Sequence, residues 1–107
     1  MKLILVTLSL LIMVACASYK PLVPSQSDAD RVAKNKPGIT LADLNLGKAI
    51  FEMKCHKCHS LKRPFTKTED VIEAVLPKMA KRAKLDSHQE ELVLNYLVTM
   101  VSAQPSK

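Results

Sequence analysis

The chain has little of what a small protein normally uses to build a core. Its 107 residues include no tryptophan, two phenylalanines, two tyrosines and only two glycines. After an N-terminal leader and a linker are set aside, roughly 65–70 residues remain to fold, a size at which apolar side chains alone give marginal stability. The length also excludes a multidomain enzyme. The sequence therefore predicts one small domain whose core is completed by something other than large side chains.

A single long apolar run occurs, over residues 3–14, and it follows a positively charged start at Lys2. It is shorter than the roughly 20 residues that span a bilayer, and it has the length of a signal-peptide hydrophobic region. The tetrapeptide Met-Val-Ala-Cys that ends at Cys16 resembles the bacterial lipobox, with Met13 where Leu is usual. We predict a signal peptide over 1–15 and lipidation of Cys16, which would anchor an exported protein at a membrane, facing the periplasm or the cell exterior. The alternatives are an ordinary cleaved signal and an uncleaved anchor.

The next segment, residues 16–39, is rich in Pro, Ser and charged residues and has no apolar periodicity. Such a segment has little to bury, so we expect a flexible linker between the lipid and a folded domain at 40–107.

Three helices are expected in that domain, and no segment has the alternation of a strand. The first, over 40–55, opens with a capping box in which Thr40 is followed by Asp43. The second starts near Thr66 or Thr68 and is expected to end or kink at Pro77. The third starts at Ser87, the first residue of a second capping box, and ends before Pro105. The predicted fold class is all-α.

The chemistry is concentrated in the segment Cys55-His56-Lys57-Cys58-His59, a C-x-x-C-H motif. This pattern is typical of covalent c-type haem attachment. Two thiols three residues apart near a helix end can reach both vinyl groups on one edge of the porphyrin, and His59 then faces the iron. The motif therefore predicts one covalent haem c, with Cys55 and Cys58 as thioethers and His59 as the proximal ligand.

Three other uses of the cysteines were weighed. A redox dithiol usually occurs in an α/β fold, and no strand is expected here. A zinc site would need two further ligands, and only His59 and His88 are candidates. A disulfide closing so short a loop adds little stability. Attachment of haem to Cys55 and Cys58, together with lipidation of Cys16, would account for all three cysteines of the sequence.

Residues 46–99 resemble the small monohaem c-type cytochromes. The features that carry the resemblance are Gly47 and Phe51 before the motif, a methionine about twenty residues after it, and a terminal helix containing Tyr96-Leu97. The resemblance implies a domain of about three helices wrapped around one haem, in which the first and last helices cross at Gly47. A glycine lets two helix backbones approach closely, and its cost in a helix requires such a reason. Some relatives have a tryptophan before the methionine, and this chain has none.

The distal ligand is predicted to be Met79, which lies twenty residues beyond His59 and just after Pro77, where a broken helix could present it. His88 and an open position are the alternatives. Met53 and His56 are too close to the attachment site to cross the haem plane, and Met100 lies on the apolar face of the last helix, where core packing is expected.

Removal of Lys2 with the leader leaves 15 basic and 10 acidic residues, a formal charge of +5. If the basic residues near the motif and near Met79 surround the haem edge, they would attract acidic redox partners. They comprise Lys54, Lys57, Lys62, Arg63, Lys67, Lys78, Lys81, Arg82 and Lys84. An exported chain with few aromatic residues is not expected to bind nucleic acid.

The resemblance implies a monomeric electron carrier and no enzymatic activity of its own, although the chain could be an accessory subunit of an oxidoreductase. The alternative function is a haem-based sensor or small-gas-binding protein with an open or displaceable distal site.

Overall fold

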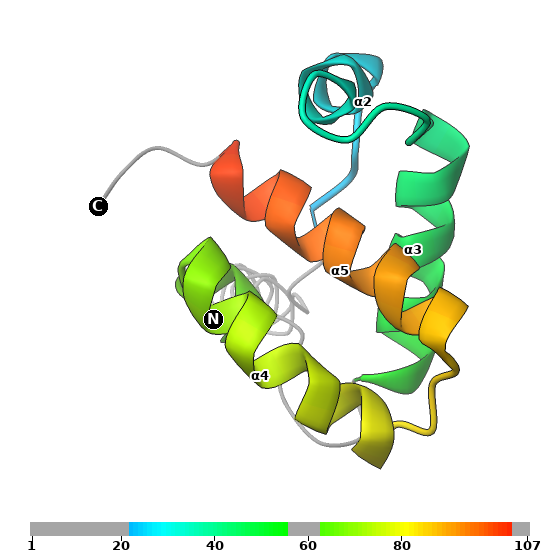
Figure 1. Ribbon diagram of the computed structural model, residues 1–107, viewed down its shortest axis with the longest axis vertical. Helices are drawn as coiled ribbons and strands as arrows, with labels where there is room; N and C mark the ends of the chain where they lie inside the picture. The colour runs from blue at the N-terminus through cyan, green and yellow to red at the C-terminus, as the bar shows by residue number, and fades with distance from the viewer. Residues whose placement is uncertain (1–21, 56–62, 104–107) are drawn as a thin grey trace, which may run out of the picture.

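The structure, a computed structural model, describes residues 22–55 and 63–103, and all of the regular structure in these residues is helical (Figure 1). The prediction of an all-α fold is confirmed for this part of the chain. The elements are the α-helices α2 (Gln26–Ala33), α3 (Leu41–Lys54), α4 (Glu69–Arg82) and α5 (Ser87–Ser102), and the 3-10 helix η2 (Arg63–Thr66). None of the described helices is long and apolar enough to cross a membrane.

Local capping patterns determine where α3 and α5 begin. The Thr40 hydroxyl accepts a hydrogen bond from the Asp43 amide at 3.2 Å, and the Asp43 carboxylate accepts one from the Thr40 amide at 2.9 Å. This capping box was predicted and is confirmed. The last helix starts at Ser87, as predicted, but its capping box lies one residue earlier than expected: Asp86, and not Ser87, caps α5 and exchanges hydrogen bonds with Gln89 at 2.8 and 3.1 Å.

Of the two outcomes expected at Pro77, an end or a kink of the helix, the end is wrong, because α4 continues through Pro77 to Arg82. Pro77 cannot donate a hydrogen bond to the carbonyl one turn earlier, which costs about 3 kcal/mol in a helix interior. Its ring lies on the exposed side of α4, while Leu76 and Ala80 on the other side are buried. Leu76 precedes the proline and Ala80 follows it in the sequence, and their burial offsets the lost hydrogen bond and keeps the helix continuous.

The expected linker contains a helix, so the expectation of a segment without regular structure is wrong for α2. This helix begins with a capping box between Ser25 and Asp28, and it buries Ala29. The chain ahead of α2 is also packed onto the domain, because the Tyr96 hydroxyl donates a 2.6 Å hydrogen bond to the Leu22 carbonyl. The folded part of the described chain therefore begins at Leu22, not at Thr40.

Helices α3 and α5 cross at Gly47, as the sequence predicted. A Cβ atom on Gly47 would lie 2.2 Å from the Leu92 carbonyl oxygen and 3.0 Å from the Tyr96 Cβ. Real Cβ atoms do not approach other atoms so closely. Only glycine allows the two helix backbones this separation.

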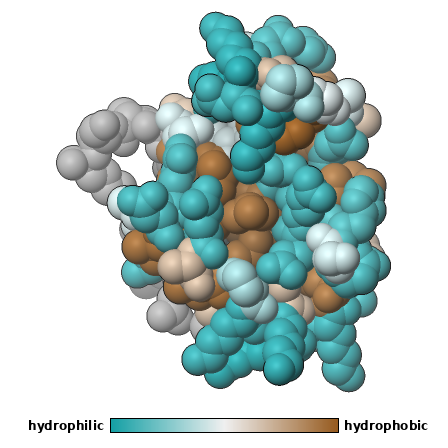
Figure 2. Space-filling view, viewed as in Figure 1, coloured by the Kyte–Doolittle hydropathy of each residue, from teal (hydrophilic) through white to brown (hydrophobic). Residues whose placement is uncertain are grey.

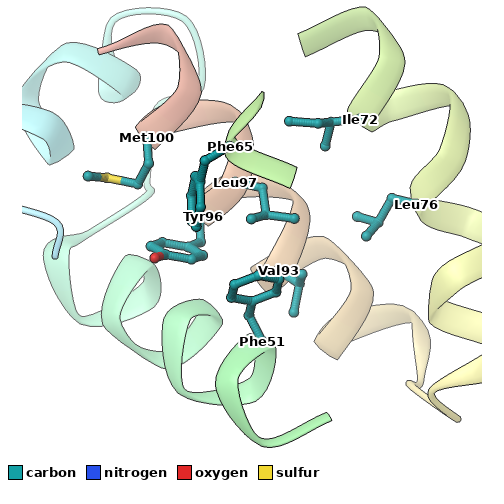
Figure 3. Packing of buried hydrophobic residues seen from close by; sticks show 8 residues of the cluster. All are labelled: Phe51, Phe65, Ile72, Leu76, Val93, Tyr96, Leu97 and Met100. Carbon is teal, nitrogen blue, oxygen red and sulfur yellow. The ribbon is translucent and has the colours of Figure 1, made fainter. Parts of the chain in front are cut away.

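The few aromatic residues are concentrated at one point of the core. Phe51, Phe65 and Tyr96 lie with their ring centroids 5.8 to 6.0 Å apart, two of the three pairs edge to face. Figure 3 shows this group beside α5, with the Ile72 and Leu76 side chains pointing from α4 toward it. The aromatic rings thus fill the centre between α3, η2 and α5, and α4 closes one side.

Candidate functional site

An apolar cleft of about 340 Å³ opens between α4, η2 and the C-terminal end of α3, with α5 beneath it. This volume lies within the range of small-molecule sites. Figure 2 shows apolar surface reaching solvent among the charged side chains of α4 and α5. The cleft is lined by Phe51, Lys54, Cys55, Pro64, Lys67, Val71, Ile72, Val75, Leu76, Met79, Arg82, Ala83 and Leu97.

The first residue of the predicted haem motif, Cys55, lines this cleft. Its amide donates to the Phe51 carbonyl at 3.0 Å, which completes the last turn of α3. Its side chain is half-buried and packs against the aromatic core. The other two haem-binding residues of the motif, Cys58 and His59, lie outside the described residues, as does the predicted lipidation site Cys16.

The predicted distal ligand, Met79, lines the same cleft. The geometry differs from the expectation of a broken helix, because Met79 lies inside α4 and is half-buried. Ile72, Leu76 and Met79 follow helical spacing, so they project from one face of α4 toward the cleft. The structure therefore brings together Cys55 and Met79, two sulfur-bearing residues 24 positions apart in the sequence.

The alternative ligand His88 is not among the residues that line the cleft; it is exposed in the first turn of α5. Its neighbour across the helix pair is Asp43, whose pKa is lowered by hydrogen bonds from the Thr40 amide and hydroxyl and also by the charge of His88. Asp43 precedes Cys55 by twelve residues, so they lie about 18 Å apart along α3 at 1.5 Å per residue. His88 is therefore near the far end of α3.

The two other methionines weighed as ligands are also outside the cleft. Met53 is 64% exposed on the outer side of α3, and Met100 is buried in the core.

The cleft carries positive charge on an apolar surface. Lys54, Lys67 and Arg82 are its charged lining residues, and none of them has an ion pair among the described residues. Such a site complements a mainly apolar ligand that carries anionic groups. Of the other basic residues grouped around the motif, Lys57 and Lys62 lie outside the described chain.

Two valines of the cleft were missed by the sequence analysis as site residues. Val71 and Val75 are 42% and 40% exposed, although both lie in a helix that buries its neighbouring face. The signal was present, because apolar residues at 71, 72, 75 and 76 cover a wider face of α4 than one packing contact needs.

The lining is suited to a haem. It consists mainly of apolar side chains, together with one cysteine, one methionine and three cations that could face the propionates. Groups of three or more His, Cys, Asp or Glu side chains that could hold a bare metal ion are absent from the described residues. The chain matches no family model, no curated protein and no solved structure. The interpretation of the cleft therefore depends on its own residues.

Proposed function

We propose that this chain is a small monohaem c-type cytochrome that carries electrons between protein partners. One observation carries the proposal: Cys55, which begins the C-x-x-C-H motif, and Met79, the methionine at the expected spacing, line the same apolar cleft. The spacing of the motif and the position of the methionine are features of the sequence, whereas their convergence on one cleft comes from the fold. The two are independent lines of support.

In this proposal each residue has a defined role toward one covalently bound haem c. Cys55 and Cys58 hold the group through thioether bonds, His59 is the proximal iron ligand and Met79 the distal one. The group supplies a one-electron iron couple, and methionine ligation raises its reduction potential relative to ligation by nitrogen alone. Helices α3, α4 and α5 surround the group, which completes the small core.

The apolar lining has its own contribution. Phe51, Ile72, Leu76 and Leu97 exclude water from the bed of the cleft, and Val71 and Val75 become covered. If His59 and Met79 both held the iron, as proposed, a substrate would find no free position on it. The chain would then be a carrier and not an enzyme, whether it acts alone as a monomer or as an accessory subunit of an oxidoreductase.

The proposed location depends on the signal-like segment that ends at Cys16, and the proposed partners depend on the positive charge of the cleft. We propose cleavage after residue 15, lipidation of Cys16, and a periplasmic or cell-surface position at a membrane. The cations Lys54, Lys67 and Arg82 at the cleft would favour partners with acidic docking surfaces and make association weaker at high salt. Nucleic acid is not an expected partner.

The decisive experiment is an absorption spectrum of the oxidised and reduced protein, produced in a host that matures c-type haem. We expect a c-type spectrum with the weak far-red band of an iron–thioether bond. Met79→Ala should abolish this band and keep the haem, while the matched control Met53→Ala, on the exposed side of α3, should leave it unchanged.

Other outcomes would redirect the function. A c-type spectrum without the far-red band, together with rapid carbon monoxide binding by the reduced protein, would favour the sensor alternative. A colourless protein containing one zinc per chain would contradict the haem proposal.

A further inference from the structure

The segment from Leu22 to Ile39, which we call the strap, is held onto the rest of the domain by a few polar contacts and a small apolar contact area around Leu22, Pro24 and Ala29. Its helix α2 places a single residue, Ala29, in the buried class. The main attachment is Arg31, whose guanidinium donates to the Ser102 hydroxyl at 2.6 Å and to the Thr99 carbonyl at 3.0 Å. The Arg31 side chain is 40% exposed, so water can replace both contacts.

The interface beneath α2 is also incompletely filled. A cavity of about 170 Å³ lies between the end of α2, the start of α4 and the C-terminal half of α5. It is lined by polar residues that include Lys36, Glu73, Asn95 and Thr99. The Thr99 hydroxyl is buried and has no hydrogen-bond partner within the described part of the chain. Opening of the strap would give this hydroxyl access to water, which lowers the net cost of opening.

The other end of the strap has one specific attachment. The Tyr96 hydroxyl donates to the Leu22 carbonyl at 2.6 Å, and Pro24 is buried next to it, while Val23 between them is 71% exposed. A third polar contact joins Lys36, whose ammonium donates to the Asn95 side-chain oxygen at 3.3 Å, so the strap is attached at Leu22, Arg31 and Lys36. Segments with few buried apolar contacts open at a lower free energy than the core around them.

We propose that the strap is a releasable element that sets how far the domain reaches from its membrane anchor. This consequence depends on the proposed lipidation of Cys16, whereas the release itself does not. With the strap docked, six residues separate Cys16 from Leu22 and span at most about 20 Å. With the strap released, 24 residues separate Cys16 from Thr40 and span at most about 80 Å. Release lets one anchored domain meet partners both near the membrane and far from it.

Hydrogen exchange of the full haem-loaded chain tests the release. We expect the amides of α2 to exchange faster than those of α3 and α5 in the unmodified protein. Arg31→Ala should accelerate exchange in α2 about tenfold further and leave α3 and α5 unchanged, because it removes one attachment of a separately opening unit. The matched control Lys34→Ala, at an exposed residue of the same segment, should have little effect.

Tyr96→Phe provides a second test, because it keeps the buried ring and removes the hydroxyl that donates to Leu22. It should accelerate exchange at the strap alone. The proposal is overturned if α2 exchanges no faster than α5, or if Arg31→Ala accelerates exchange equally in all helices. Either result would mean that the strap opens only when the whole domain unfolds.

The reach is measured separately, on lipidated protein in vesicles, by energy transfer from a dye at Ala49→Cys to a dye in the membrane. Arg31→Ala should increase the fraction of molecules with a long distance between the two dyes about tenfold, the same factor by which it accelerates amide exchange in α2. If Cys16→Ser protein binds vesicles as well as the unmodified protein, the proposed anchor is wrong and the exchange result still decides the release. If the anchor holds and the distances do not change with Arg31→Ala, the role in reach is refuted.

Discussion

Replacing Gly47 with alanine tests the crossing on which the fold depends. The new methyl group would lie 2.2 Å from the Leu92 carbonyl oxygen and 2.8 Å from the Leu92 carbonyl carbon. Both are backbone atoms of α5, so no side-chain rotation can relieve the contact. The two helices would have to separate by about 1 Å, and inserting a methylene into a well-packed interior costs about 1–3 kcal/mol.

An opposing effect must be subtracted, because alanine stabilises a helix by about 1 kcal/mol relative to glycine. The contact involves backbone, so we place its cost at the upper end of the range and expect a net loss of about 2 kcal/mol. For a domain of this size such a loss lowers the melting temperature by about 8–16 °C. Thermal and urea unfolding followed by far-ultraviolet circular dichroism measure both quantities.

A matched control isolates the intrinsic helix preference. Ala49 lies on the exposed side of α3, two residues after Gly47. Ala49→Gly makes the reverse exchange without a close contact, so it should cost about 1 kcal/mol. Gly47→Ala could instead raise the free energy of unfolding by as much as Ala49→Gly lowers it. The backbones of α3 and α5 would then not be in close contact at Gly47, and the reasoning from the Cβ distances would be refuted.

Three further predictions follow from the described residues. Lys84→Gly should stabilise the protein by about 1 kcal/mol in urea unfolding, because Lys84, two residues after the end of α4, has a φ of 58°, a conformation that favours glycine; no gain would refute it. Thr99→Val should also raise stability by about 1 kcal/mol, because it replaces a buried hydroxyl that has no partner in the described chain with a methyl group, and a loss would show that the hydroxyl is satisfied. Asp43→Asn should cost about 0.5 kcal/mol at pH 6, where the carboxylate is charged at the start of α3. The pKa of Asp43 is lowered in the folded protein by the Thr40 hydrogen bonds, so its contribution is complete above the ordinary pKa of 3.8 and is lost as the pH falls through the folded value. The difference in unfolding free energy between Asp43→Asn and the unmodified protein should therefore shrink as the pH falls from 6 to 2, and a difference that does not change with pH would contradict this origin.

The features that the sequence predicted correctly are local ones. The capping box at Thr40 needs only two side chains three residues apart, so the pattern itself contains the structure. The crossing at Gly47 was predictable for a different reason: glycine is unfavourable in a helix interior, so its presence there indicates a close packing contact. The haem attachment that the C-x-x-C-H motif predicts stays a prediction; the fold adds that Cys55 lines the apolar cleft.

Helix α2 was missed because its attachment is not local. Its capping residues Ser25 and Asp28 could have been noticed, but the helix buries little apolar surface, so no periodic pattern marks it. What holds it are polar contacts from Arg31 and the Leu22 carbonyl to α5, about seventy positions away in the sequence. Residue types alone do not indicate which distant backbone carbonyl will accept such a hydrogen bond.

The error at Pro77 bears directly on the site. A proline in a helix interior costs about 3 kcal/mol, and a fully buried Leu or Met side chain gains about 1.5–3 kcal/mol. Leu76 and Ala80 are buried and Met79 is half-buried, so packing on the core side can exceed the cost on the exposed side. The continuous helix then fixes Met79 in register with Leu76, which a broken chain would not do. A sulfur side chain held on a rigid helix beside an apolar cleft is a better preorganised ligand than one on a loop, because fewer conformations are lost when it binds. Pro77 is therefore compatible with the proposed role of Met79, although not in the way that the sequence first indicated.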